Sequence, residues 1–212
     1  MFRGTELPEA QPLTKDEARE HLGLSQRSTT LLHFGLNHIY KNFEVIFEAL
    51  RGFQLDCQLV FAGKVDPNSP VNNPWQLAQK YGLQQNTIII DKYITDEEAK
   101  YYFYAADALI LSHRKEFKEA SGVLSDATHF NLPVIAADVG EVGELVTTHG
   151  LGLTFEAEDP QSLREALLSF LDLKEDEKQQ IKRNSAEFAL THSWQELAQR
   201  HVELYQSLFE QG

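Results

Sequence analysis

The sequence lacks several features that would assign the chain to particular protein classes. Its 212 residues include one cysteine, so an internal disulfide is excluded, and Cys57 lies in an apolar stretch where a buried thiol is expected. No run approaches the ~20 apolar residues that are needed to cross a bilayer. The N-terminal segment also lacks the apolar centre of a signal peptide. These absences predict a cytoplasmic protein.

Positive charge is scarce as well. The chain has 19 Lys and Arg against 32 Asp and Glu, which gives a formal net charge of −13. Nucleic-acid backbones and anionic lipid surfaces both require clustered basic residues, so both kinds of partner are disfavoured. A local positive pocket for one small anion is still compatible with this composition.

Several ligand-binding motifs are missing. The chain has no Asp-x-Asp pair, which a metal-dependent sugar transferase would use to hold a divalent cation. It has neither G-x-G-x-x-G nor a Walker loop, which weakens dinucleotide-binding and kinase interpretations. Its eight histidines show no close ligand spacing, and dispersed histidines are more often structural or solvated. We therefore predict no metal and no cofactor.

Short apolar segments alternate with amphipathic ones from residue 14 onward, after a linker at 1–13. A hydrophobic content of 42% suits one globular domain, predicted over 14–212. Expected strands are Thr29–Phe34, Cys57–Ala62, Thr87–Asp91, Ala108–Ser112, Pro133–Ala137 and Leu151–Phe155. Expected helices are 14–22, Asn42–Leu50, Pro74–Tyr81, Asp96–Ala106, Ser121–Phe130, Val142–Thr147, Pro160–Leu171, Glu175–Thr191 and Trp194–Glu210.

This alternation predicts an α/β fold. The strands are apolar on both faces, as parallel strands covered by helices on both sides are. Repeated strand–helix–strand units imply a Rossmann-like, six-stranded parallel sheet with right-handed crossovers, followed by extra C-terminal helices. Because ligands of such sheets bind beyond the carboxyl ends of the strands, the segments that follow the strands are the candidate site.

The segment after the first expected strand pairs a glycine with a lysine. Gly35 would let the backbone approach a ligand closely. Lys41 stands at the start of a helix, where the helix dipole already favours negative charge. A lysine there strengthens phosphate binding but does not favour the helix itself. A solvated loop lysine is the alternative.

The segment after the fourth strand suggests a diphosphate site more directly. Ser121 and Gly122 open a helix whose first N–H groups would point at a bound anion. Asp126 follows Gly122 at i+4 spacing, and its carboxylate can accept hydrogen bonds from two neighbouring sugar hydroxyls. An ordinary serine cap followed by an acidic residue is the alternative.

Two stretches resemble the C-terminal domain of family-four glycosyltransferases, also called glycosyl transferases group 1. One is F-G-L-N-H-I-Y-K-N at 34–42. The other begins S-H-R at 112–114 and continues as S-G-V-L-x-D-A at 121–127 and L-P-V-I-A-A-D-V-G-E-V-G-E-L-V at 132–146. The resemblance extends from about Glu17 to Glu210.

The resemblance implies the C-terminal half of a GT-B fold, which binds a UDP- or GDP-sugar without metal in a retaining hexosyltransferase. Gly35 and Lys41 would face the diphosphate, and Arg114 matches a basic residue of some relatives. Glu119 would be the catalytic acidic residue near the donor sugar. The remaining implied contacts are the diphosphate N–H groups of Ser121, Gly122 and Val123, the ribose partner Asp126, and the base neighbours Lys92, Tyr93 and Ile94.

The chain departs from the family pattern at several positions. Asp126 replaces a glutamate, and Leu36 stands where many relatives have an arginine, for which His38 or Arg114 could compensate. Such enzymes are about twice this length, because each half needs ~100–200 residues. An N-terminal acceptor-binding domain, in the same gene or a separate subunit, would be the required partner.

Two alternatives to a hexosyltransferase acting on a glycan or lipid-linked acceptor stay open. One is a non-catalytic nucleotide or nucleotide-sugar binding module, which the altered acidic motif favours. The other, weaker, is a sugar-nucleotide epimerase of similar fold. In the transferase interpretation the isolated chain is expected to bind a donor without transferring the sugar, since the acceptor has no evident site. The epimerase would also need both domains.

Overall fold

The computed structural model describes residues 13–53, 56–65 and 73–210. The predicted linker at 1–13 lies outside this range except for Leu13, which packs against the core.

One six-stranded sheet forms the centre of the molecule, and all of its paired strands are parallel. This confirms the predicted sheet. The strand order is β3-β2-β1-β4-β5-β6, so the chain builds outward from β1 in one direction and then returns to build outward from β4 in the other. The strands are β1 (Thr29–Phe34), β2 (Cys57–Ala62), β3 (Thr87–Ile90), β4 (Ala108–Leu111), β5 (Val134–Ala137) and β6 (Gly152–Phe155).

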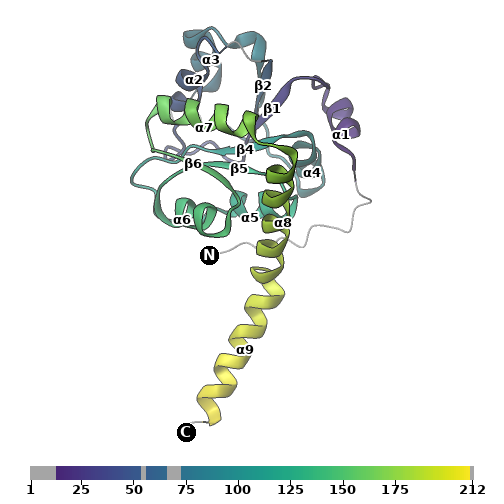
Figure 1. Ribbon diagram of the computed structural model, residues 1–212, viewed down its shortest axis with the longest axis vertical. Helices are drawn as coiled ribbons and strands as arrows, with labels where there is room; N and C mark the ends of the chain where they lie inside the picture. The colour runs from purple at the N-terminus through teal and green to yellow at the C-terminus, as the bar shows by residue number, and fades with distance from the viewer. Residues whose placement is uncertain (1–12, 54–55, 66–72, 211–212) are drawn as a thin grey trace.

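Helices cover both faces of the sheet, as expected for strands that are apolar throughout (Figure 1). One face carries α2 (Phe43–Leu50), α3 (Pro74–Tyr81) and α7 (Pro160–Asp172). The other carries α1 (Lys15–Leu22), α4 (Asp96–Ala105), α5 (Gly122–His129), α6 (Gly140–His149) and α8 (Glu175–Thr191). Successive strand residues point to opposite faces, so Leu31 lies in one core cluster and Leu32 in the other.

Helix starts follow local chemistry closely. The predicted capping boxes are confirmed at Thr14 with Glu17 and at Thr95 with Glu98. Ser193 accepts a hydrogen bond from the backbone N of Glu196 at 3.2 Å, as expected of an N-cap. These contacts explain why most predicted helices begin within one residue of their observed start.

The predicted helix at Val142–Thr147 was too short, since α6 runs from Gly140 to His149. The sequence predicted a glycine turn before this helix, but Gly140 is its first residue. Gly140 has φ +51, and an added Cβ would lie 2.6 Å from the Lys118 Cα, so the helix begins where its backbone meets the loop before α5. Gly143 lies inside the helix, as predicted, and an added Cβ there would come within 2.6 Å of the Asp138 carboxylate oxygen.

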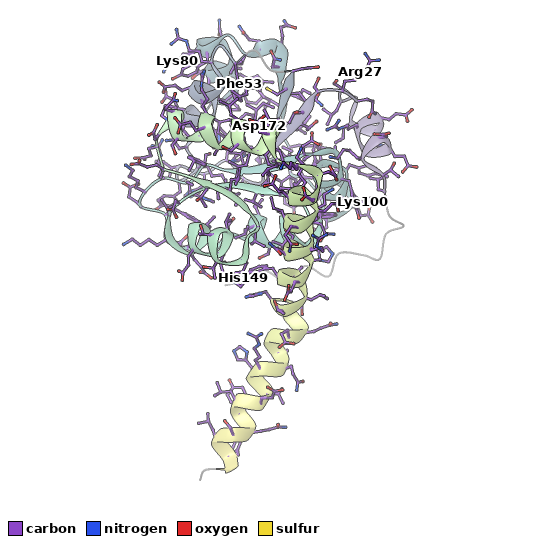
Figure 2. The ribbon with its side chains drawn as sticks, in the orientation of Figure 1. Arg27, Phe53, Lys80, Lys100, His149 and Asp172 are labelled. Carbon is purple, nitrogen blue, oxygen red and sulfur yellow. The ribbon has the colours of Figure 1, made fainter. Side chains whose placement is uncertain are left out.

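The last helix, α9 (Trp194–Glu210), continues from α8 and projects away from the body (Figure 1). Figure 2 shows its side chains extending clear of the sheet and its covering helices. Large apolar side chains are exposed along it, among them Tyr205 at 59%, Leu208 at 59% and Phe209 at 86%. An apolar face of this kind marks a surface that packs against something else.

Candidate functional site

The strand order places the candidate site at one point on the sheet edge. Because β1 lies next to β4, the segments that follow these two strands leave the same edge side by side. Their connections run to opposite faces, since α2 covers one face and α5 the other. Such a switch point is where open parallel sheets bind ligands. The two segments are those that hold Gly35 to Lys41 and His113 to Gly122.

Direct contacts hold the two segments together. Residues Lys41 and His113 form an antiparallel bridge. The backbone N of Asn42 donates to the Ser112 carbonyl at 2.7 Å, and the N of Arg114 donates to the Tyr40 carbonyl at 2.9 Å. The segments thus form one continuous surface at the sheet edge.

Gly35, Lys41 and Val123 converge on one small volume. A Cβ built on Gly35 would lie 3.4 Å from Lys41 Nζ and 3.4 Å from Val123 Cγ2. Gly35 has φ +90, a conformation that disfavours other residues. The lysine after the first strand and the first turn of α5 therefore face the same space.

The Lys41 side chain is half-buried. Its Nζ donates to the Phe34 carbonyl at 2.8 Å. Burial lowers the pKa of Lys41 from 10.5 to about 8, because removal from water disfavours the charged form. A bound diphosphate would offset this cost, since a neighbouring anion stabilises the ammonium. The geometry and the electrostatics both suit an anion.

Two buried histidines flank this lysine. His113 is 4% exposed and stacks on Phe117 with ring centroids 3.9 Å apart. Burial, with a further contribution from Lys41, lowers the pKa of His113 to about 3. His33 lies between Phe43 and Phe61, and burial together with Lys41 and His113 lowers its pKa well below 6.5. Both imidazoles are therefore neutral at physiological pH and leave Lys41 as the positive charge among these three groups.

His113 was not among the residues predicted for the site. Its Nδ1 has no hydrogen-bond partner among the described residues. A buried polar atom left without a partner is costly, so a neutral imidazole beside Lys41 is a candidate donor or acceptor to a ligand. The feature of the sequence that could have identified His113 is its position, two residues after the last residue of β4.

The start of α5 offers backbone donors. Ser121 precedes the helix with extended backbone angles, and its side chain makes no capping hydrogen bond within the described residues. An added Cβ on Gly122 would meet nothing within 4 Å, so the backbone there is open to approach. The first N–H groups of a helix lack intrahelical acceptors, which makes this start suitable for a phosphate. Asp126 lies one turn further along α5.

The three residues predicted to border a base follow β3, two strands away from β1. Neighbouring strands are ~4.8 Å apart, so this segment is displaced from the end of β1 by roughly 10 Å. Tyr93 is 77% exposed, whereas Ile94 is 9% exposed and packs in the core. Lys92 forms an ion pair with Glu98. A ligand contact from Ile94 would therefore come from its backbone.

The other two predicted residues lie in the loop before α5. Glu119 is exposed. Arg114 points back across the surface, where its Nε donates to the Ile39 carbonyl at 3.1 Å and its Nη1 lies 3.4 Å from Glu158 Oε1. Arg114 thus contacts protein groups on two other segments.

Two kinds of feature were not found in the part of the chain that the structure describes. No group of three His, Cys, Asp or Glu side chains is arranged to hold a metal ion there. No helix within the described ranges combines the length and apolar character of a membrane span.

Comparisons with known proteins agree with this architecture. The family model described as "Glycosyl transferases group 1" matches residues 14–187. A sucrose-phosphate synthase from Thermosynechococcus elongatus is similar in structure over 99% of this chain and 52% of its own, with a TM-score of 0.82 and 23% identity. The C-terminal domain of LpcC, a glycosyl transferase group 1 family protein from Francisella tularensis, is similar over 90% of this chain and 95% of its own, with a TM-score of 0.70 and 18% identity.

A third similar structure carries a ligand. Anabaena Alr3699/HepE, in complex with UDP-glucose, is matched over 93% of this chain and 54% of its own, with a TM-score of 0.77 and 18% identity. The chain spans about half the length of the HepE and synthase chains. Curated protein sequences gave no match.

Proposed function

This chain belongs to the glycosyl transferases group 1 family, and we propose that it is the half of a retaining hexosyltransferase that binds the nucleotide-sugar donor. The observation that carries the proposal is the convergence of Gly35, Lys41 and Val123 at the switch point of the sheet. A desolvated ammonium opposite a helix start is complementary to two linked phosphates. The structure of HepE with UDP-glucose supports a UDP-sugar over a GDP-sugar as the donor.

The proposed chemistry is electrostatic. As the bond between the sugar and the diphosphate breaks, negative charge develops on the departing phosphate oxygens. Lys41 and the N–H groups of Ser121, Gly122 and Val123 would stabilise that charge from fixed positions, which requires no metal. Asp126 would hold the ribose hydroxyls, and Glu119 would act near the donor sugar.

Transfer also requires an acceptor, and we assign the acceptor site to a second half of the enzyme. The exposed apolar face of α9 supports this assignment, because it provides a packing surface outside the donor-binding body. Glycans and lipid-linked sugars are the acceptor classes proposed. In this arrangement the isolated chain binds the donor but transfers no sugar.

Titration calorimetry with UDP-glucose, GDP-mannose, free UDP and free GDP tests the proposal. Saturable binding of one nucleotide-sugar is expected, with the matching free nucleoside diphosphate also binding. Absence of binding by both nucleotide families would refute it. The alternative of a non-catalytic binding module is distinguished by supplying the second half, since only a transferase would then move sugar to an acceptor.

Asp126→Asn is expected to separate the two ends of the nucleotide. If Asp126 accepts hydrogen bonds from the ribose, loss of its charge should weaken UDP binding by about 1.5–3 kcal/mol, the range for hydrogen bonds to a charged group. Binding of inorganic pyrophosphate should change much less. Calorimetry with both ligands measures the difference, and equal losses would remove Asp126 from the ribose end of the site.

The pH dependence of binding should follow Lys41. UDP phosphates are fully ionised above about pH 7, whereas the pKa of Lys41 in the free protein is about 8. UDP affinity should therefore be highest below pH 8 and fall as the pH rises further, because the ammonium loses its proton. Calorimetry across this range should show no such fall for Lys41→Arg, since arginine stays protonated. A fall of equal steepness in both proteins would assign the titration elsewhere.

A further inference from the structure

Arg114 connects three segments that are distant in sequence. Its backbone N donates to the Tyr40 carbonyl at 2.9 Å, and its side-chain Nε donates to the Ile39 carbonyl at 3.1 Å. Both acceptors immediately precede Lys41. Its Nη1 reaches Glu158 Oε1 at 3.4 Å, in the turn between β6 and α7. One side chain thus fastens the lysine-bearing loop to the opposite half of the sheet.

Glu158 makes this contact from an unfavourable backbone conformation. Its φ of +65 is left-handed, which glycine adopts easily and a glutamate does not. Asn131 is the other non-glycine residue with positive φ in the described ranges, and asparagine tolerates that region. The strained Glu158 is also the residue whose carboxylate meets Arg114, which suggests a role for that side chain.

A neighbouring ion pair provides an internal comparison. Lys115 and Glu156 join the same two segments with 4.0 Å between Nζ and Oε1, and their side chains are 56% and 71% exposed. The side chains of Arg114 and Glu158 are 26% and 32% exposed. An ion pair as exposed as Lys115 and Glu156 contributes little to stability. The Arg114 contacts therefore account for more of the attachment between the two segments.

We propose that Arg114 and Glu158 are positioning residues that hold the loop carrying Lys41 in its place against the first turn of α5. This inference rests on the proposed function, because it concerns how the proposed donor site is held in place. Arg114 would then serve the diphosphate through Lys41 and not by contact with the ligand. The turn between β6 and α7 would be part of the binding machinery although it lies outside the volume on which Gly35, Lys41 and Val123 converge.

Glu158→Gly tests the proposal, because it keeps the left-handed backbone and removes the carboxylate. If the loop loosens, Lys41 becomes more hydrated and its pKa rises from about 8 toward 10.5. Electrostatics alone predicts the opposite direction, since removing a nearby anion lowers the pKa of a lysine. The pKa of Lys41 can be followed in the free protein by NMR of lysines labelled at Cε. The other titratable groups around Lys41 and Arg114 are His33, His113 and Glu44.

The expected results are a rise of about one unit or more in the Lys41 pKa and a UDP Kd about tenfold higher. The melting temperature should not fall, because glycine relieves the backbone strain. Glu158→Gln should raise the pKa likewise but melt lower than Glu158→Gly. Glu156→Gln, the matched control in the same turn, should leave the Lys41 pKa unchanged.

A Lys41 pKa that stays the same or falls in Glu158→Gly would overturn the proposal. A Lys41 pKa that rises in Glu158→Gly, when the wild-type protein has no affinity for UDP or GDP, would support the positioning role and refute the proposed function. The positioning role and the proposed function can therefore be refuted separately.

Discussion

Lys41→Met is expected to weaken UDP binding by about 1–3 kcal/mol while making the free protein more stable. Binding weakens because a charge-assisted contact to the diphosphate is lost. Stability rises because the folded protein partly removes the Lys41 ammonium from water, which lowers its pKa to about 8. A methionine of similar length removes that unfavourable burial. Opposite effects on binding and stability are typical of a residue retained for function.

The stability gain should itself depend on pH. A lysine whose folded pKa lies below its unfolded value binds more protons when the chain is unfolded. The destabilisation by Lys41 is therefore fully present below pH 8 and disappears as the pH approaches 10.5. The difference in melting temperature between Lys41→Met and the wild type should shrink over the same range.

Lys64→Met is the matched control for this experiment. Lys64 follows β2 as Lys41 follows β1, but its side chain is 59% exposed and lies 3.8 Å from Asp91 in an ion pair. Lys64→Met should change neither the UDP affinity nor the melting temperature appreciably. Unchanged UDP affinity in Lys41→Met would remove Lys41 from the site.

Gly63→Ala should destabilise the fold by about 2–4 kcal/mol. An added Cβ would lie 2.1 Å from the Gly35 carbonyl oxygen, so the segments after β1 and β2 would have to separate. The φ of Gly63, +147, adds backbone strain. Because Gly35 lies beside Lys41 in the proposed diphosphate site, UDP affinity should fall as well. Chemical denaturation measures the free energy of unfolding, and calorimetry measures the affinity.

Gly82→Ala separates steric crowding from backbone conformation. Gly82 has φ +71 at the end of α3, and an added Cβ there would meet nothing within 4 Å. This variant should lose only about 1–2 kcal/mol and keep its UDP affinity. Equal losses of stability in the two variants would contradict the crowding assigned to Gly63.

Local chemistry allowed most of the secondary structure to be predicted. The observed bounds of β1, β2, α3, α8 and α9 are those predicted, because apolar runs, capping residues and terminal glycines act over a few residues. The error at the start of α6 has a tertiary cause, since Gly140, predicted in a turn, packs against the backbone of Lys118. A linear pattern does not reveal that contact.

The candidate site could be predicted only in pieces. The sequence places Gly35, Lys41 and Gly122 in segments that follow strands, but it does not place those strands next to one another. Burial determines which other residues belong to the site. His113 belongs to the site because it is enclosed beside Lys41, and Ile94, predicted near a base, packs in the core.

The sequence by itself determined the six parallel strands, their covering helices and the residues at the strand ends, since each depends on periodicity and capping over a short stretch. Only the tertiary structure decided that β1 lies beside β4, that Lys41 is desolvated there, and that Arg114 reaches Glu158 across 44 positions. The physical reason is that desolvation and non-local contact depend on distances in space, which the order of residues does not specify.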